Sequence, residues 1–207
     1  MRPLVTNEAT NMAAMSALRS ASEPKPLLLA LADEVQERAP GFRVEIIGGR
    51  ITATPPADFA HARALTKIML RIGAAVDGGA AEVVQAVGVW LGGPEDYAIP
   101  DYSIVDADIE EHLVKYNCYE PVCFRAVLEV TSSNRSSDLV DKRAAYAEAG
   151  IPVYVIVDRK DQVVLVLTDP ADEDYQSEMI YHRGESFTLP DSVGTRAVID
   201  VDLALGL

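Results

Sequence analysis

Residues 126–150 read AVLEVTSSNRSSDLVDKRAAYAEAG and decide the fold, because they begin as a buried strand and end as a helix. The apolar run at the start is nearly continuous, which is typical of a strand covered on both faces. The helical part follows Ser and Asp residues suited to capping and stops at Gly150. A second apolar run, VYVIVD, occupies 153–158. The order strand, helix, strand predicts a parallel crossover and therefore an α/β sheet.

The flanking segments extend this pattern on both sides. Apolar residues at helical spacing predict two helices, and runs of apolar and β-branched residues predict strands. The predicted helices are PLLLALADEVQERAPG at 26–41 and DFAHARALTKIMLRIGAAV at 58–76. The second of them should pack on a sheet. The predicted strands are a hairpin in FRVEIIGGRITATPP at 42–56, single strands in AEVVQAVGVWLG at 81–92 and AIPDYSIVDAD at 98–108, a buried strand in CFRAVLEVT at 123–131, QVVLVLT at 162–168, and short edge strands within 174–201.

Length and composition fit one domain. The chain has 207 residues, and we predict a polar, mobile arm over 1–22 followed by a single domain over 23–207. The N-terminal segment lacks a continuous apolar stretch, and no apolar run reaches the length of a membrane span, so we expect a cytoplasmic protein. Cys118 and Cys123 do not have the spacing of a zinc or redox motif, so we expect free thiols.

The net charge of −14 argues against a protein that coats nucleic acid non-specifically, because such binding depends on Lys and Arg neutralising phosphates. It leaves room for an enzyme whose acidic residues gather metal ions and whose basic residues line one groove. The glycine-containing turns GGR and DGGA do not follow the phosphate-loop pattern. Nucleotide binding through a glycine loop therefore has little support.

A carboxylate inside the buried strand is the first sign of a functional site. Glu129 interrupts the apolar run, and a buried charge needs a partner or a metal. Strand alternation places Glu129 and Thr131 on the same face. Asp101 begins the neighbouring strand-like segment PDYSIV. Two carboxylates from neighbouring strands can share Mg²⁺, which prefers oxygen ligands, and such a metal supports in-line displacement at a phosphoryl group.

The helix after the buried strand carries a lysine on its apolar side. Lys142 lies three residues after Leu139 and four before Tyr146, so the three side chains share one side of the helix. Tyr146 is best interpreted as a core residue. His61 lies near the start of the 58–76 helix, where a capping or buried histidine is the simpler interpretation than a catalytic base.

Purely structural interpretations of the same residues stay open. Asp101 follows a proline and can be an ordinary strand-start residue. Glu129 can form an ion pair with Arg125 or Lys142. Asp138 can pair with Lys142 at the i,i+4 spacing, an effect of about 0.5 kcal/mol or less on an exposed helix. In these cases ion pairing and local structure explain the charged residues, and no catalytic role is needed.

Several motifs together resemble the Uma-two family of the PD-(D/E)xK nuclease superfamily. They are VEIIGGRITATPP at 44–56 followed by His61, IPDYSIV at 99–105, and LEVTSSNRSSDLVDKRAAYAEAGIPVYVIVD at 128–158. The resemblance covers roughly residues 42–160. It implies a restriction-endonuclease-like core, which is a mixed β-sheet flanked by helices with an N-terminal β-hairpin.

The resemblance also implies a set of site residues. Asp101 and Glu129 become ligands of Mg²⁺ or Mn²⁺, and the backbone carbonyl of Val130 becomes a third ligand. Glu45 matches an acid at the start of the family's hairpin motif and becomes an additional ligand or a water-orienting acid. These assignments imply a metal-dependent endonuclease that hydrolyses DNA phosphodiester bonds, with a homodimer expected because two strands need two sites.

The sequence departs from the superfamily pattern at the position of the usual lysine. That position, two residues after the acid, is Thr131, whose hydroxyl cannot supply a positive charge near an attacking water. The Uma-two pattern places the lysine on the next helix, where it becomes Lys142. The missing lysine and the acidic balance also favour an alternative from another class, a catalytically inactive nuclease-like fold that serves as a binding or assembly module.

Overall fold

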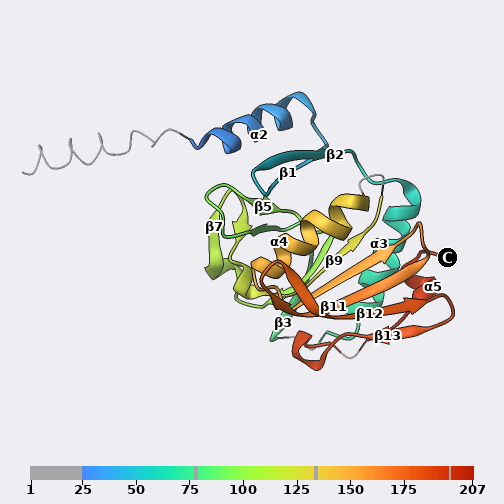
Figure 1. The fold of residues 1–207 in the computed structure, drawn as a ribbon. Helices are drawn as coiled ribbons and strands as arrows, with labels where there is room; N and C mark the ends of the chain where they lie inside the picture. Colours follow the sequence, from blue (N-terminus) through green and yellow to red (C-terminus); the bar gives the residue numbers. More distant parts are fainter. Residues whose placement is uncertain (1–24, 77–78, 133–134, 196) are drawn as a thin grey trace, which may run out of the picture.

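The computed structural model describes residues 25–76, 79–132, 135–195 and 197–207, which form two six-stranded sheets and a two-stranded ribbon (Figure 1). The arm predicted over 1–22 lies outside the described residues. We call the sheet that contains β9 and β10 the central sheet and the sheet that contains the β1–β2 hairpin the hairpin sheet. The mixed α/β architecture predicted from the sequence is confirmed.

The strand order of each sheet follows from its pairing. The central sheet runs β12 (Asp174–His182), β11 (Val163–Ala171), β10 (Val153–Asp158), β9 (Phe124–Val130), β6 (Tyr102–Asp106), β3 (Ala81–Gln85). The hairpin sheet runs β2 (Arg50–Thr54), β1 (Arg43–Ile47), β5 (Tyr97–Ala98), β4 (Gly88–Trp90), β8 (Cys118–Tyr119), β7 (Leu113–Lys115). The ribbon pairs β13 (Ser186–Thr188) with β14 (Val198–Asp200).

The predicted crossover forms the middle of the central sheet. β9 and β10 are parallel, with Leu128 opposite Val155, whereas the other pairs in this sheet are antiparallel. A π-helical turn, η3 (Ser137–Asp141), precedes the crossover helix α4 (Lys142–Glu148). Because a π turn contains more residues than an α turn, it changes the direction in which the following side chains point, just before Lys142. The chain leaves the helix at Gly150, which has a φ of +73°.

Helices cover both faces of the central sheet. α3 (Phe59–Gly73) packs its buried residues Ala64, Ile68 and Ile72 against one face. α4 packs Tyr146 and Ala147 against the other face. Successive side chains of β9 point to opposite faces of the sheet, and both faces are covered, so most residues of this strand are apolar. Glu129 is therefore placed on the α4 side, beneath Lys142.

The remaining elements complete the periphery. α2 (Leu27–Arg38) lies over the β1–β2 hairpin, at the opposite end of the molecule from β13 (Figure 1). α5 (Val201–Ala204) follows β14, and the short helical turns are η1 (Ile109–His112), η2 (Pro121–Cys123) and η4 (Asp191–Val193). β13 and β14 are short, as predicted for this region, but the edge strand β12 has nine residues, so the prediction of short strands is wrong for β12. Among the described residues, no helix has the length and apolar character needed to cross a membrane.

Two segments predicted as single strands each divide between the two sheets. Residues 81–92 form β3 in the central sheet and β4 in the hairpin sheet, and Ala86 between them has a φ of +52°. Residues 97–106 form β5 and then β6, with Pro100 between them. Proline cannot donate a ladder hydrogen bond, so the strand breaks there. Asp101 consequently lies where the chain crosses from the hairpin sheet to the central sheet.

Replacing Gly150 with Ala should lower the free energy of unfolding by about 1 kcal/mol, because an L-residue is strained at positive φ. An added Cβ would meet nothing within 4 Å at this position, so the backbone conformation is the only cost. Urea denaturation measures the change. Gly73→Ala, where φ is not positive and space is also open, is the matched control and should cause no loss. Equal losses in both variants would contradict the explanation.

Candidate active site

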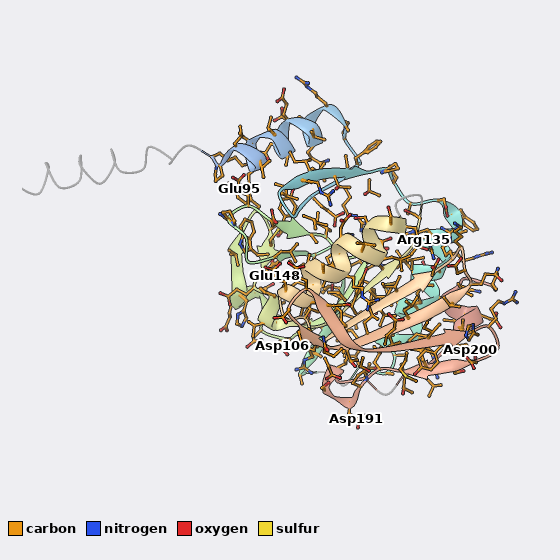
Figure 2. The ribbon with its side chains drawn as sticks, viewed as in Figure 1. Glu95, Asp106, Arg135, Glu148, Asp191 and Asp200 are labelled. Atoms are coloured by element: carbon orange, nitrogen blue, oxygen red, sulfur yellow. The ribbon has the colours of Figure 1, made fainter. Side chains whose placement is uncertain are left out.

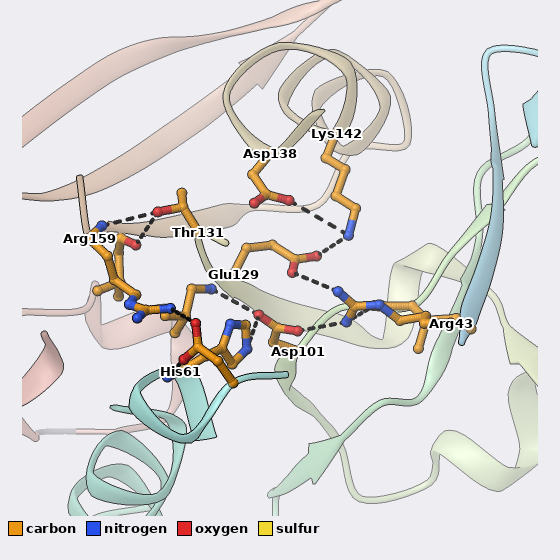
Figure 3. Close-up of polar contacts among 12 residues, drawn as sticks. Arg43, His61, Asp101, Glu129, Thr131, Asp138, Lys142 and Arg159 are labelled. Carbon is orange, nitrogen blue, oxygen red and sulfur yellow. Dashed lines mark hydrogen bonds and ion pairs between the residues drawn. The ribbon is translucent and has the colours of Figure 1, made fainter. Parts of the chain in front are cut away.

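A buried ion pair joins the central strand to the crossover helix. Lys142 Nζ donates to Glu129 Oε1 at 2.7 Å, and the two side chains are 2% and 1% exposed (Figure 3). The Tyr146 hydroxyl, one turn further along the helix, donates to the same oxygen at 3.1 Å. The helix face that the sequence indicated therefore places its lysine directly over the carboxylate of β9.

The hairpin sheet supplies a second acid to this ion pair. Glu45 lies in β1 and is 1% exposed, and its Oε1 is 3.1 Å from Lys142 Nζ. The same oxygen accepts a hydrogen bond from the Ile99 amide at 2.7 Å. Asp138 contributes a third carboxylate, 3.9 Å from Lys142 and one turn before it. Lys142 thus faces acids from three separate elements.

Asp101 lies beside this group, at the crossing between the sheets. Its Oδ2 accepts from the Val130 amide at 2.9 Å and lies 3.1 Å from His61 Nε2. Its Oδ1 accepts from Arg43 at 2.6 Å. The contact with Val130 uses the backbone N–H, so the predicted role of the Val130 carbonyl as a metal ligand stays a prediction.

Arg43 is a site residue that the sequence reasoning missed. Its guanidinium bonds Asp101, also donates to the Ile99 carbonyl at 2.9 Å, and lies 3.9 Å from Glu129 Oε2 and 3.8 Å from Glu45 Oε2. Figure 3 shows it reaching between the carboxylates from the β1 side. Strand alternation was the available signal, because Arg43 lies two residues before Glu45 and therefore on the same face.

His61 is both buried and part of the site. Its backbone N–H donates to the Asp58 side chain at 2.7 Å, which caps α3, and its side chain is 6% exposed. The prediction of a buried histidine at the helix start is confirmed, but it omitted the contact between the ring and Asp101. Nδ1 of this ring is buried and has no hydrogen-bond partner among the described residues.

Thr131 does not take part in the cluster. β9 ends at Val130, and the Thr131 hydroxyl donates to the Val157 carbonyl at 3.3 Å and accepts from the Arg159 amide at 3.0 Å. Both hydrogen bonds tie β9 to β10, so this residue joins strands instead of facing Lys142. Arg125, an alternative partner for Glu129, bonds Asp106 at 2.6 Å.

Burial and the neighbouring charges together set the pKa values of the acids in the cluster. Burial raises the pKa of Asp101, but the His61 hydrogen bond and the Arg43 charge outweigh it and hold that pKa well below the usual range. Burial raises the pKa of Glu129 well above its usual value, against the opposing charge of Lys142. Burial also raises the pKa of Asp138 to about 6.

Lys142 remains a cation at neutral pH. Burial lowers its pKa, but the charges of Glu129 and Glu45 outweigh burial and hold the pKa above the ordinary value. The cluster therefore contains the fixed cations Lys142 and Arg43 together with His61.

The donor chemistry of the cluster fits a hard divalent cation. Four carboxyl groups, on Glu45, Asp101, Glu129 and Asp138, face the two fixed cations, so acidic groups outnumber fixed cations. Carboxylate oxygens are the ligands that Mg²⁺ and Mn²⁺ prefer. Within the described ranges, no group of three His, Cys, Asp or Glu side chains is already arranged around one ion position. Asp101 and Glu129, which both lie near the Arg43 guanidinium, are the carboxylates that would contact a metal together with other ligands.

A pocket of about 380 Å³ opens onto one side of the cluster. Arg43, His61 and Asp101 line it, together with Pro55, Pro56 and other residues at the end of the hairpin. Glu129, Lys142 and Glu45 do not line it, because they are packed behind Arg43 and Asp101. The exposed carboxylate of Asp58 also lines the pocket, whereas other exposed acids, such as Glu148, Asp191 and Asp200, do not (Figure 2). A ligand in the pocket would meet one guanidinium, the Asp101–His61 pair and the Asp58 carboxylate.

Comparison with known proteins gives a family and a fold. The Uma2 family sequence model, described as "Putative restriction endonuclease", matches residues 28–202. A crystal structure described as "a putative nuclease belonging to DUF820 from Anabaena variabilis ATCC 29413" superposes with a TM-score of 0.63 and 18% sequence identity. The similarity covers 78% of this chain and 89% of that chain. No curated protein matches the chain.

Proposed function

The chain belongs to the Uma2 family of restriction-endonuclease-like proteins, and from this premise we propose that it is a metal-dependent endonuclease that hydrolyses DNA phosphodiester bonds. One observation carries the proposal. Asp101, Glu129 and Lys142 come from three different elements and meet in one buried cluster next to a pocket. If these residues only stabilised the fold, no pocket would be needed beside them, so the pocket supports a role in binding a substrate.

Asp101 and Glu129 would hold Mg²⁺ or Mn²⁺, with the Val130 carbonyl as a further ligand and Glu45 as an additional acid. A divalent cation bound by such carboxylates polarises a phosphoryl oxygen and lowers the pKa of a water molecule. Lys142 remains protonated beside Glu129, so its ammonium can orient the attacking water and stabilise the charge that develops on the phosphate.

Binding of DNA is expected to be local. The net charge of −14 gives no general attraction for a polyanion, so phosphate contacts depend on Arg43 at the pocket. We further propose that the protein acts in the cytoplasm and forms a homodimer, since cleavage of both strands of a duplex needs two sites. Light scattering of the purified protein tests the dimer.

Mn²⁺ should raise the melting temperature of the protein, because an ion that binds only the folded state stabilises it by mass action. At 100 times the dissociation constant, the stabilisation is about 2.7 kcal/mol. Asp101→Asn should abolish most of this shift, since it removes a ligand charge. Asp106→Asn, a change of the same kind at the far end of β6, is the control and should keep the shift. Cleavage of DNA with Mg²⁺ or Mn²⁺ that stops on chelation tests the activity itself.

The second candidate is a nuclease-like fold without catalysis, used as a binding or assembly module. The observation that favours it is the pairing of Asp101 with Arg43 and of Glu129 with Lys142, which satisfies both acids within the protein. A module of this kind should show no thermal shift with Mn²⁺ and no cleavage. A shift that Asp101→Asn removes would instead argue against it.

A further inference from the structure

Arg43 fills the space between the acids that are proposed to bind metal. Its Nη1 is 2.6 Å from Asp101 Oδ1, and its Nη2 is 3.9 Å from Glu129 Oε2. A guanidinium and a divalent cation are attracted by the same two carboxylates. Since both are positively charged, they repel each other at such short range in a partly buried site. Arg43 and the metal therefore compete for this place.

Arg43 is also the cation that a ligand in the pocket meets. Among the described residues that line the pocket it is the only Lys or Arg, and its side chain is 23% exposed. Lys142, the other fixed cation, is 2% exposed and does not line the pocket. A guanidinium can bind a phosphate through two parallel hydrogen bonds, which suits a phosphodiester.

We propose that Arg43 exchanges between these two positions: it neutralises Asp101 and Glu129 before metal binds, and it binds the substrate phosphodiester in the pocket once a divalent cation has taken its place. The proposal rests on the proposed function, because it needs the metal site. Each ligand releases Arg43 for the other. Binding of the phosphodiester and binding of the metal must then strengthen each other by the same factor.

Three proteins test the exchange: wild type, Arg43→Gln and the control Arg50→Gln. Arg50 lies in β2, is 72% exposed and bonds Asp141 at 2.7 Å, so its replacement makes the same charge change outside the cluster. Mn²⁺ affinity is measured by electron paramagnetic resonance of the free ion. Each measurement is made with and without a short phosphorothioate oligonucleotide that resists hydrolysis. Thermal melting without metal checks that each variant is folded.

Arg43→Gln should bind Mn²⁺ about tenfold more tightly than wild type, within the 5–150-fold range typical of coupled sites. The oligonucleotide should raise the Mn²⁺ affinity of wild type and of Arg50→Gln but not of Arg43→Gln. The loss of this response separates exchange from a simple charge effect, which would raise affinity and leave the response intact.

If wild type binds Mn²⁺ but neither the oligonucleotide nor Arg43→Gln alters the affinity, the exchange is wrong and the metal site stands. If no protein binds Mn²⁺ under any condition, the proposed function fails. Should Arg43→Gln not fold, Arg43→Lys serves instead, because a compact ammonium cannot bridge both acids or bind phosphate with two parallel hydrogen bonds. It should show a smaller rise in affinity and a weaker response, and behaviour equal to wild type would overturn the exchange.

Discussion

Replacing Lys142 with Met should lower the free energy of unfolding by about 3–5 kcal/mol, because removing one partner of a buried ion pair leaves an uncompensated charge. The ammonium is buried and lies within 3.1 Å of both Glu129 and Glu45. Methionine fills a similar volume, so packing changes little. The loss in the free energy of unfolding then comes mainly from removing the charge. Chemical denaturation with circular dichroism gives the value.

A second substitution tests the reason for this loss. Adding Glu129→Gln to Lys142→Met should restore part of the stability, because it removes the charge left without its partner. The two changes should therefore be non-additive by 0.5–3 kcal/mol, a range typical of contacting residues. Lys160→Met, at an exposed lysine, is the control and should stay within about 0.5 kcal/mol of wild type. Full additivity would mean that the pair does not act as a unit.

Glu129→Gln alone should reduce DNA cleavage by roughly a thousandfold, since a metal supplies several kcal/mol of transition-state stabilisation and each 1.36 kcal/mol is tenfold in rate. The substitution keeps the shape of the side chain, and Lys142 keeps Glu45 as a carboxylate partner at 3.1 Å, so the fold should persist. Initial rates on linear and circular DNA with Mg²⁺ or Mn²⁺ measure the effect.

Glu148→Gln is the matched control for this experiment. Glu148 ends α4 but is exposed, so its variant should cleave DNA at the wild-type rate. A melting curve for each protein shows that lost activity is not lost structure. If a folded Glu129→Gln protein cleaved DNA as fast as wild type, Glu129 would not be a metal ligand. If wild type were inert on every DNA tested, the binding-module alternative would be favoured.

Sequence reasoning located the central part of the site because local rules apply there. The run around Glu129 predicts a buried strand, and the helical spacing of Lys142 and Tyr146 predicts one helix side, so their contact follows from the crossover. The same reasoning placed Thr131 on the same face as Glu129, but strand alternation stops where β9 ends at Val130. Its hydroxyl bonds the backbone of β10 instead.

The sequence by itself determined the crossover around β9 and β10, the hairpin, and the carboxylate and lysine that face each other, because periodicity and turn residues act over short distances. Only the tertiary structure decided that Arg43 and His61 join Asp101. Their contacts depend on Pro100 ending one strand pairing, so that the chain crosses between two sheets and brings β1 and α3 to the same point. Strand alternation puts Arg43 on the same face as Glu45, but periodicity within one strand cannot show that this face meets Asp101.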